Sequence, residues 1–295
     1  MGCIALKVLR ELGIRVPAVF THHDNPNENI WFDSLSKLAT DMGIPVYFPS
    51  NINDSKWVEI IKRLRPEIIL SCYFRQMVGE EILRIPRMAA VNLHGSLLPR
   101  YRGRCPVNWQ IVNGERVGGL TLHHMVKKAD AGDIIAQKEV EIDIEDTALT
   151  LYRKLEGCAG PLLTQYIPQL LKGTAPRIPQ DHSRASYFGG RTPEDGKIDW
   201  SWEAIRIYNL IRAVTWPYPG AFTFLNGEKI MFWKAQLTSL DEPEVLAGTV
   251  LHLKSGCMVK TGMGLLKILT VSKKDTGPEQ ALPPQELLPD RGFLY

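Results

Sequence analysis

The chain has 295 residues, of which 44% are hydrophobic and 23% charged, as is usual for a folded globular protein. Its net charge of +3 is too balanced to indicate a nucleic-acid-binding protein. No apolar run approaches the roughly 20 residues that span a membrane, and the N-terminus lacks the basic leader of a signal peptide, so we expect a cytoplasmic protein without a membrane anchor.

Up to about residue 140, short β-rich runs alternate with helical patterns, which is typical of a parallel sheet covered by helices. The expected strands are residues 18–21, 46–48, 68–72, 89–93, 120–124 and 134–140. The expected helices are residues 4–12, 57–64 and 146–171, the last of which Gly160-Pro161 could kink or split. These patterns predict a Rossmann-like α/β domain with a parallel sheet.

The second half of the chain differs in composition. Residues 173–196 are rich in proline, glycine, serine and charge, which indicates a linker, and a helix is expected over 202–213. Short strands follow at 221–225, 229–233, 252–259 and 265–271, the first two joined by the turn pair Asn226-Gly227. We therefore predict an N-terminal domain over 1–178, a linker over 179–196 and a small β domain over 197–295, for which the pattern allows a barrel or a sandwich and an OB-like β-barrel is favoured.

The most informative segment, residues 91–103, begins at the carboxyl end of a predicted strand, where open α/β sheets place their ligands. Asn92 and His94 lie two residues apart, so in a strand they project from the same face. An amide can hold an oxyanion and an imidazole can move a proton, which together suit attack on a carbonyl group. The alternative is a strand end at which both side chains only satisfy nearby backbone groups.

A second segment, Lys127-Lys128-Ala129-Asp130-Ala131-Gly132-Asp133, follows another predicted strand. An acidic residue there could accept a hydrogen bond from the imidazole and raise its basicity. The alternative is an ordinary tight turn.

Taken together, the loop Ser96-Leu97-Leu98-Pro99-x-Tyr101-Arg102-Gly103 behind Asn92-x-His94, followed by Asp130-Ala131-Gly132-Asp133, resembles the signature of the formyltransferases that use 10-formyltetrahydrofolate. The resemblance extends over nearly the whole chain. It is greatest to the formyltransferase domains of the bifunctional polymyxin-resistance (lipid A aminoarabinose) enzymes. The stretches that favour this subfamily are residues 20–26, 43–47, 92–95, 113–115 and 191–195.

The resemblance implies a role for each matching residue. Asn92 would hold the oxyanion, His94 would transfer the proton and Asp130 would tune His94. The implied contacts to the folate donor are Gln76, Met77, Val78, Arg104, Val126, Lys127, Lys128, Ala129 and Asp130. The reaction needs no metal.

The implied acceptor is the amine of a nucleotide-linked amino sugar, with UDP-4-amino-4-deoxy-L-arabinose favoured over related UDP or dTDP sugars. One alternative is methionyl-tRNA formyltransferase, against which the acidic residues interspersed with lysines over 236–295 argue mildly. A non-catalytic folate- or nucleotide-binding module is another. A dinucleotide oxidoreductase is disfavoured because no G-x-G-x-x-G follows a predicted strand. The oligomeric state stays open, a homo-oligomer included.

Other polar and aromatic residues allow two interpretations. Arg191 could contact a nucleotide diphosphate or be a solvated linker arginine, and the aromatic residues of 216–219 could line a cleft or pack at a domain junction. Adjacent histidines in a strand point to opposite faces, so neither His22-His23 nor His123-His124 predicts a chelate. The five cysteines contain no C-x-x-C pair, so we expect free thiols.

Two departures from the family pattern concern the ends of the chain. Similar proteins have a β-strand ahead of Gly2, and its loss would expose neighbouring strand edges, so we expect either a start further upstream or a domain that tolerates the gap. The dehydrogenase half of the bifunctional relatives is also not expected in this chain.

Overall fold

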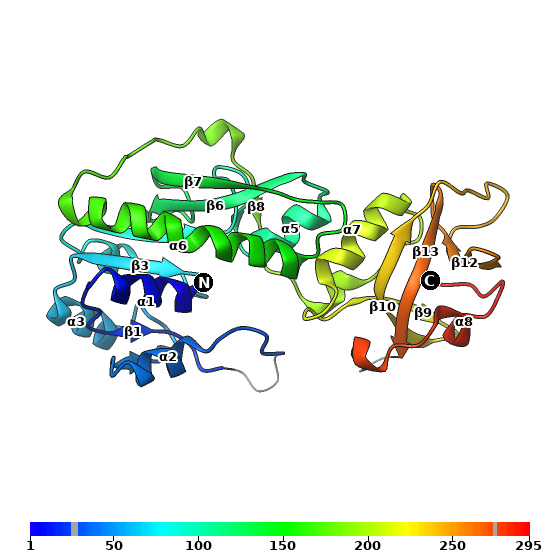
Figure 1. Cartoon of the computed structure of the whole chain (residues 1–295), viewed down its shortest axis with the longest axis horizontal. Coiled ribbons are helices and arrows are strands. Elements are labelled where there is room, and N and C mark those ends of the chain that lie inside the picture. The colour runs from blue at the N-terminus through cyan, green and yellow to red at the C-terminus, as the bar shows by residue number, and fades with distance from the viewer. Residues whose placement is uncertain (25–28, 274–275) are drawn as a thin grey trace. The chain divides into compact units, whose positions relative to one another are not determined.

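The computed structural model describes residues 1–24, 29–273 and 276–295 (Figure 1). Asn25 and Pro26, which contribute to one of the stretches that favoured the subfamily, lie outside the described residues. The chain forms two compact units. Unit 1 comprises Met1–Pro106, Val117–Glu141 and Tyr152–Gly189, and unit 2 comprises Val107–Arg116, Ile142–Leu151 and Gly190–Tyr295. The domain boundaries at residues 178 and 196 stay a prediction.

Unit 1 is built on a four-stranded mixed sheet. Its order is β3 (Ile68–Cys72), β4 (Ala89–His94), β6 (Val117–His124) and β7 (Ile134–Glu141). Only β3 and β4 are parallel, because β6 runs antiparallel to both β4 and β7. The prediction of a parallel sheet is therefore wrong for β6, the one strand of the four that runs opposite to the others; β7 runs in the same direction as β3 and β4 but pairs antiparallel with β6. Residues 125–133 join these two strands without the helical crossover that parallel neighbours require.

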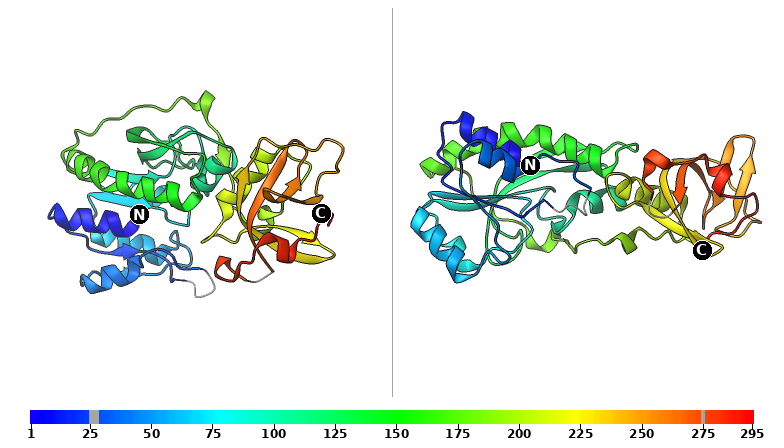
Figure 2. Two further views of the ribbon diagram at one scale, coloured as in Figure 1. Left: turned by 45° about the vertical axis from the view of Figure 1, so that its right-hand side comes forward. Right: turned by 90° about the horizontal axis from the view of Figure 1, so that it is seen from below.

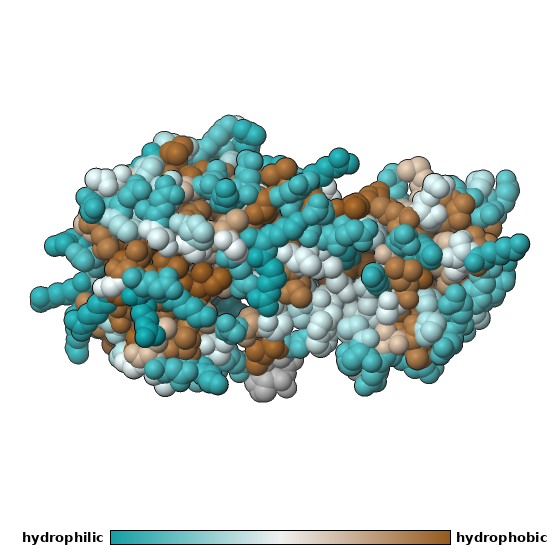
Figure 3. Space-filling view, viewed as in Figure 1, coloured by the Kyte–Doolittle hydropathy of each residue, from teal (hydrophilic) through white to brown (hydrophobic). Residues whose placement is uncertain are grey.

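Two shorter strands, β1 (Val19–Phe20) and β2 (Val46–Tyr47), form a parallel pair of their own. Among the described strands, β3 is hydrogen-bonded to β4 alone. All five residues of β3 are only half-buried, and hydrophobic residues are visible on the face of unit 1 where β3 and α1 (Gly2–Glu11) lie (Figure 3). The apolar side chains of β3 are thus only partly shielded from solvent in this structure.

The helices of unit 1 pack around these sheets. Helix α1 contacts α2 (Leu35–Asp41) and β3 (Figure 2). Helix α3 (Ser55–Leu64) packs against the short α4 (Glu80–Leu83). Helix α6 (Ala148–Lys172) continues through Pro161, so the proline does not split it. Its first four residues belong to unit 2 and the rest to unit 1.

Short elements follow the loop after β4. Strand β5 (Arg102–Gly103) pairs in parallel with β8 (Tyr187–Phe188), and a 3-10 helix (His182–Arg184) precedes β8. Helix α5 (Pro106–Val112) follows β5.

Unit 2 contains helix α7 (Ala204–Val214) and a five-stranded antiparallel sheet in the order β11-β12-β13-β10-β9. The strands are β9 (Ala221–Leu225), β10 (Glu228–Leu237), β11 (Val250–Leu253), β12 (Gly256–Lys260) and β13 (Leu265–Lys273). The turn Asn226-Gly227 joins β9 to β10 with positive φ at both residues, so the predicted hairpin is confirmed. The remaining elements are 3-10 helices at Pro193–Gly196 and Pro278–Gln280 and helix α8 (Pro284–Leu287).

The last residues of the chain pair with both outer strands of this sheet. Leu294 bridges Leu225 of β9, and Phe293 bridges Thr249 just ahead of β11. These bridges give the two edge strands hydrogen-bond partners, which limits open edges. The OB-like topology itself stays a prediction.

In the described part of the chain, no helix is both long and apolar enough to cross a bilayer.

Candidate active site

The centre of the candidate site is the antiparallel pairing of β4 with β6. In this register Asn92 lies opposite His123, and His94 lies opposite Thr121. Residues directly opposite each other share a face of the sheet, so Asn92, His94 and His123 point to the same side. His94 and His123 are buried, with 6% and 1% of their surface exposed.

Asp130 reaches this face from the turn between β6 and β7. Its φ of 51° places it in the left-handed region, which Asp tolerates better than most residues. Its Oδ2 accepts a 2.8 Å hydrogen bond from the Gly103 N–H. Gly103 has a φ of +98°, and a Cβ on it would lie 2.3 Å from the Phe188 carbonyl oxygen. The close approach of β5 to β8 therefore requires glycine, and this packing presents its N–H to the carboxylate.

The three residues predicted as catalytic lie together in the structure. Asn92 Nδ2 is 3.4 Å from Asp130 Oδ1, and His94 Nδ1 is 3.7 Å from Asp130 Oδ2. Asp130 therefore faces both Asn92 and His94, although its bond to the amide is long and its contact with His94 is beyond ordinary hydrogen-bond length.

The backbone fixes the tautomer of His94. Its Nε2 lies 2.8 Å from the Tyr101 carbonyl oxygen, which only accepts, so Nε2 carries a proton. In the neutral ring Nδ1 is then the basic atom, and it faces Asp130. Burial lowers the pKa of His94, while the charge of Asp130 and the bond to Tyr101 oppose that shift. His94 is thus held as a neutral base.

Asp130 is held ionised. Burial works against ionisation, but the contacts with the imidazoles of His123 and His94 and the Gly103 N–H together lower the pKa of Asp130 to about 2. A permanent carboxylate beside His94 Nδ1 stabilises an imidazolium once a proton arrives. An amide donor, a neutral base and this carboxylate on one face form an arrangement that suits acyl transfer.

The loop after β4 is fastened by side chains that the sequence did not single out. Thr121 Oγ1 donates to the Ser96 carbonyl at 2.6 Å, and the Leu98 N–H donates back to Thr121 Oγ1 at 3.2 Å. Gln137 Nε2 donates to the Leu98 carbonyl at 2.9 Å. These bonds hold the loop that supplies the Tyr101 carbonyl to His94.

A buried arginine supports the other side of Asp130. Arg102 is fully buried, and its guanidinium donates to Gln180 Oε1 at 2.6 Å and to the Tyr187 hydroxyl at 2.6 Å. The Gln180 amide in turn donates to the carbonyls of Asp130 and Gly132. Arg102 and Gln180 thus connect β5 to the Asp130 turn, a link between distant segments that only the fold shows.

The predicted donor-binding residues after β3 differ in how far their side chains are exposed and in what they contact. The Gln76 side chain is engaged within the protein, because its Oε1 accepts from the Ile52 N–H at 2.7 Å and its Nε2 donates to the Pro49 carbonyl at 2.8 Å. Met77 is 57% exposed, and Val78 packs against a hydrophobic cluster that includes Ile52. Only Met77 presents much of its side chain to solvent.

The second predicted donor-binding segment lies in the loop of Asp130. Val126, Lys127 and Lys128 are exposed and Ala129 is half-buried. Lys127 Nζ lies 3.7 Å from Glu80 Oε2, at the start of α4 just after Val78, so the two predicted segments approach each other. Arg104 is exposed, and its N–H donates to the Phe188 carbonyl. A role for these residues in donor binding stays a prediction.

Arg191 and residues 216–219, which the sequence left open, belong to unit 2, whereas Asn92, His94 and Asp130 belong to unit 1. Arg191, in unit 2, has its guanidinium 4.6 Å from the centre of the Trp109 ring and donates to the Asp195 carbonyl. Trp216 is 44% exposed. Within the described ranges, no cluster of three or more His, Cys, Asp or Glu side chains is arranged to hold a metal ion.

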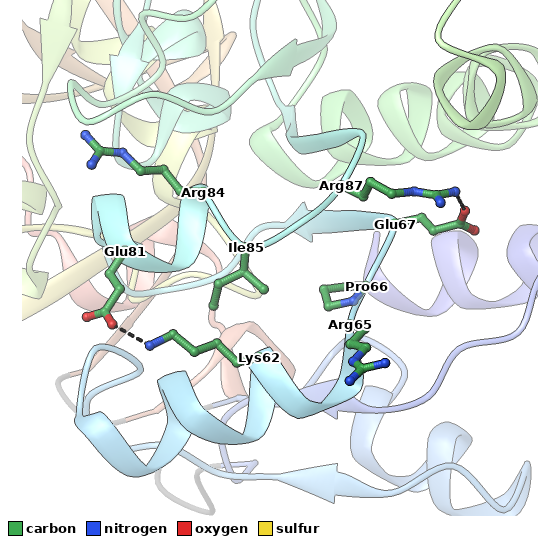
Figure 4. A pocket seen from close by; sticks show the side chains of 8 residues that line it. All are labelled: Lys62, Arg65, Pro66, Glu67, Glu81, Arg84, Ile85 and Arg87. Atoms are coloured by element: carbon green, nitrogen blue, oxygen red, sulfur yellow. Dashed lines mark hydrogen bonds and ion pairs between the residues drawn. The ribbon is translucent and has the colours of Figure 1, made fainter.

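A cavity of about 650 Å³ opens between α3 and α4 (Figure 4). It is lined by residues that are mostly charged: Lys62, Arg65, Pro66, Glu67, Glu81, Arg84, Ile85 and Arg87. Lys62 spans it to Glu81 through a 2.9 Å ion pair. None of the predicted site residues lines this cavity.

His123 also belongs to the site, although the sequence pattern raises it only as a metal ligand. Its Nε2 lies 3.3 Å from Asn92 Nδ2 and 3.4 Å from Asp130 Oδ1. The sequence signal that would have found it is the alignment of 120–124 against 89–93 as antiparallel neighbours, which places His123 opposite Asn92.

Solved structures with a similar fold include three N-formyltransferases. WlaRD, a sugar 3N-formyl transferase solved in the presence of dTDP and 5-N-formyl-THF, is 21% identical with a TM-score of 0.69, covering 93% of this chain and 94% of that chain. The N-formyltransferase from Helicobacter canadensis, in complex with folinic acid and dTDP-3-aminofucose, is 23% identical with a TM-score of 0.69, covering 90% and 94%. A 4-N formyltransferase from Francisella tularensis is 22% identical with a TM-score of 0.59, covering 74% and 87%.

The sequence also matches two families. Residues 9–167 match the formyl transferase family, and residues 191–282 match the formyl transferase C-terminal domain. The first match alone extends over more than half of the chain, and it contains Asn92, His94 and Asp130 on one face of the mixed sheet. The chain therefore belongs to the formyl transferase family and is a formyltransferase.

Proposed function

We propose that the protein moves the formyl group of 10-formyltetrahydrofolate to the amine of a nucleotide-linked amino sugar, with UDP-4-amino-4-deoxy-L-arabinose as the acceptor. The observation that carries this proposal is the convergence of Asn92, His94 and Asp130, with Nδ1 of His94 3.7 Å from the Asp130 carboxylate. The N-formyltransferases of similar fold, two of which were solved with a formylated folate and a dTDP compound, support the choice of donor and acceptor class.

In the proposed reaction the unprotonated amine attacks the formyl carbon, and the carbonyl oxygen becomes an oxyanion. An N–H of Asn92 donates to that oxygen, which is where charge develops. His94 Nδ1 takes the proton from the attacking nitrogen, and Asp130 stabilises the resulting imidazolium. When the carbon–nitrogen bond to the folate breaks, His94 returns the proton to the departing folate nitrogen. The products are the N-formyl sugar and tetrahydrofolate.

The donor-binding role is proposed for the segments Gln76–Val78 and Val126–Asp130 and for Arg104. The ion pair between Lys127 and Glu80 supports a shared wall built by the first two segments. Because the side chain of Gln76 is already bonded to Ile52 and Pro49, this segment would offer main-chain atoms and Met77 to the donor.

The test is a formyl-transfer assay of the purified protein with 10-formyltetrahydrofolate and three acceptors offered in parallel: UDP-4-amino-4-deoxy-L-arabinose, a dTDP-4-amino sugar and charged initiator tRNA. We expect turnover on the UDP sugar. Preference for the dTDP sugar would overturn the choice of nucleotide sugar but keep the reaction. Turnover on tRNA alone, or donor binding without transfer to any acceptor, would overturn the proposed function.

A further inference from the structure

We infer that His123 is a positioning residue for Asn92: its imidazole orients the Asn92 amide so that the NH2 group, rather than the carbonyl oxygen, faces the reacting centre. This inference rests on the proposed function for its kinetic consequence, while its structural basis is independent of the acceptor. His123 is 1% exposed and lies directly opposite Asn92 in the β4/β6 ladder.

The backbone determines which nitrogen of His123 carries the proton. Nδ1 lies 2.8 Å from the His124 carbonyl oxygen, and a carbonyl only accepts, so Nδ1 carries the hydrogen. In the neutral ring Nε2 is then an acceptor. It lies 3.3 Å from Asn92 Nδ2, so one amide hydrogen of Asn92 points to it.

The second amide hydrogen of Asn92 has its own acceptor, Asp130 Oδ1, at 3.4 Å. If the amide were flipped, its carbonyl oxygen would face both the Nε2 lone pair and a carboxylate oxygen, and all three are acceptors. The pair of acceptors therefore selects one of the two amide orientations. Both contacts are made by Asn92 Nδ2, so each acceptor disfavours the flipped amide, and His123 adds its preference to that of Asp130.

Both bonds of the Asn92 amide are long for hydrogen bonds. Long bonds are weak, so either hydrogen can be shared with a substrate oxygen that arrives beside Nδ2. His123 thus keeps the donor group correctly turned without holding it so tightly that it cannot serve the oxyanion. Correct orientation before substrate arrives is the usual source of such stabilisation.

Two substitutions of similar polarity separate this role from simple packing. In His123→Gln the longer amide reaches about as far as Nε2 and offers an oxygen to Asn92. In His123→Asn the shorter amide reaches only about as far as Nδ1, so it keeps a donor for the His124 carbonyl but loses the contact with Asn92. His252→Asn is the matched control, because His252 of unit 2 also bonds a backbone carbonyl, that of Leu288.

We expect His123→Asn to lower kcat about 10-fold to 100-fold with KM changed less than about 3-fold, since a misaligned oxyanion donor costs part of the roughly 100-fold to 1000-fold that its removal costs. We expect His123→Gln to remain within about 5-fold of the parent and His252→Asn to be unchanged. In an Asn92→Ala background, His123→Asn should have almost no further effect, because the residue acts through Asn92. Equal losses in the Gln and Asn variants, or full additivity with Asn92→Ala, would overturn the inference.

A nitrogen NMR measurement on the imidazole of His123 tests the inference without any acceptor. We expect Nδ1 to appear protonated and Nε2 unprotonated at neutral pH in the folded parent protein. The opposite tautomer would overturn the inference even if the enzyme is active. If no acceptor supports turnover but this tautomer is observed, the proposed function fails while the positioning contact stands.

Discussion

Replacing Asp130 by Asn removes a charge from the site while keeping the shape of the side chain. The new carbonyl oxygen can still accept from the Gly103 N–H, so the turn should persist. What is lost is the negative charge beside His94 Nδ1, which the account assigns to stabilising the imidazolium.

The size of the effect follows from the distance. Unit charges 3.7 Å apart interact by about 4.5 kcal/mol at an effective dielectric constant of about 20, equivalent to about a 2000-fold change in rate. A proton about half transferred in the transition state would feel about half of that energy, or about 40-fold. We therefore expect Asp130→Asn to lower kcat by about 40-fold to 2000-fold.

The assay is steady-state formyl transfer measured across pH, with Asp133→Asn as the control. Asp133 lies in the same turn and pairs with Arg177 at 3.1 Å rather than with the site. Because Asp130 raises the pKa of His94, its loss should lower that pKa and move the acidic limb of kcat/KM to lower pH. A kcat within about 3-fold of the parent, with an unmoved acidic limb, would refute the assignment of Asp130.

Three further outcomes are expected. Asn92→Ala should lower kcat by at least about 100-fold with its thermal unfolding unchanged, and a loss of only a few-fold would remove Asn92 from the mechanism. Gly132→Ala should lower the free energy of unfolding by about 1–3 kcal/mol, because the added Cβ would lie 2.0 Å from the His124 carbonyl oxygen. Gly157→Ala in α6 should be neutral or stabilising in the same denaturant titration, because among the described residues its Cβ would meet nothing within 4 Å beyond its chain neighbours and the backbone of its own helix. Burial lowers the pKa of His124 to about 4, helped by the charge of Arg177, so the unfolded chain binds more protons than the folded chain between about pH 6.5 and 4. The free energy of unfolding should therefore fall as pH falls through this range, by at most about 1.4 kcal/mol per pH unit. Equal stability at pH 7 and pH 5 would contradict this.

Local sequence signals predicted the elements well where a single segment determines them. The apolar run of β3 and the turn Asn226-Gly227 are examples, because a run of apolar residues and a turn pair that tolerates positive φ are both local features of the sequence. The reversed direction of β6 could not be predicted in the same way, since strand direction depends on the connection and on neighbours elsewhere in the chain.

The residues of the candidate site also divide into those that local sequence spacing indicates and those that only the fold brings together. Asn92 and His94 follow from their two-residue spacing on a strand, whereas Asp130 required either the family resemblance or the fold to bring it 3.7 Å from His94. His123 and Arg102 were missed because their partners, Asn92 and Gln180, lie on other segments and become neighbours only through the strand register and the β5–β8 pairing.

The most direct test of the account follows the formyl group itself. Purified protein would be supplied with 10-formyltetrahydrofolate labelled with carbon-13 in the formyl group, together with UDP-4-amino-4-deoxy-L-arabinose, and the label would be traced by NMR and mass spectrometry. The account predicts that the label appears as an amide on the sugar nitrogen, with one tetrahydrofolate released for each N-formyl sugar formed, and that Asn92→Ala abolishes most of this transfer. Label that stays on the folate or is released as formate, from protein shown to be folded and to bind the donor, would contradict it.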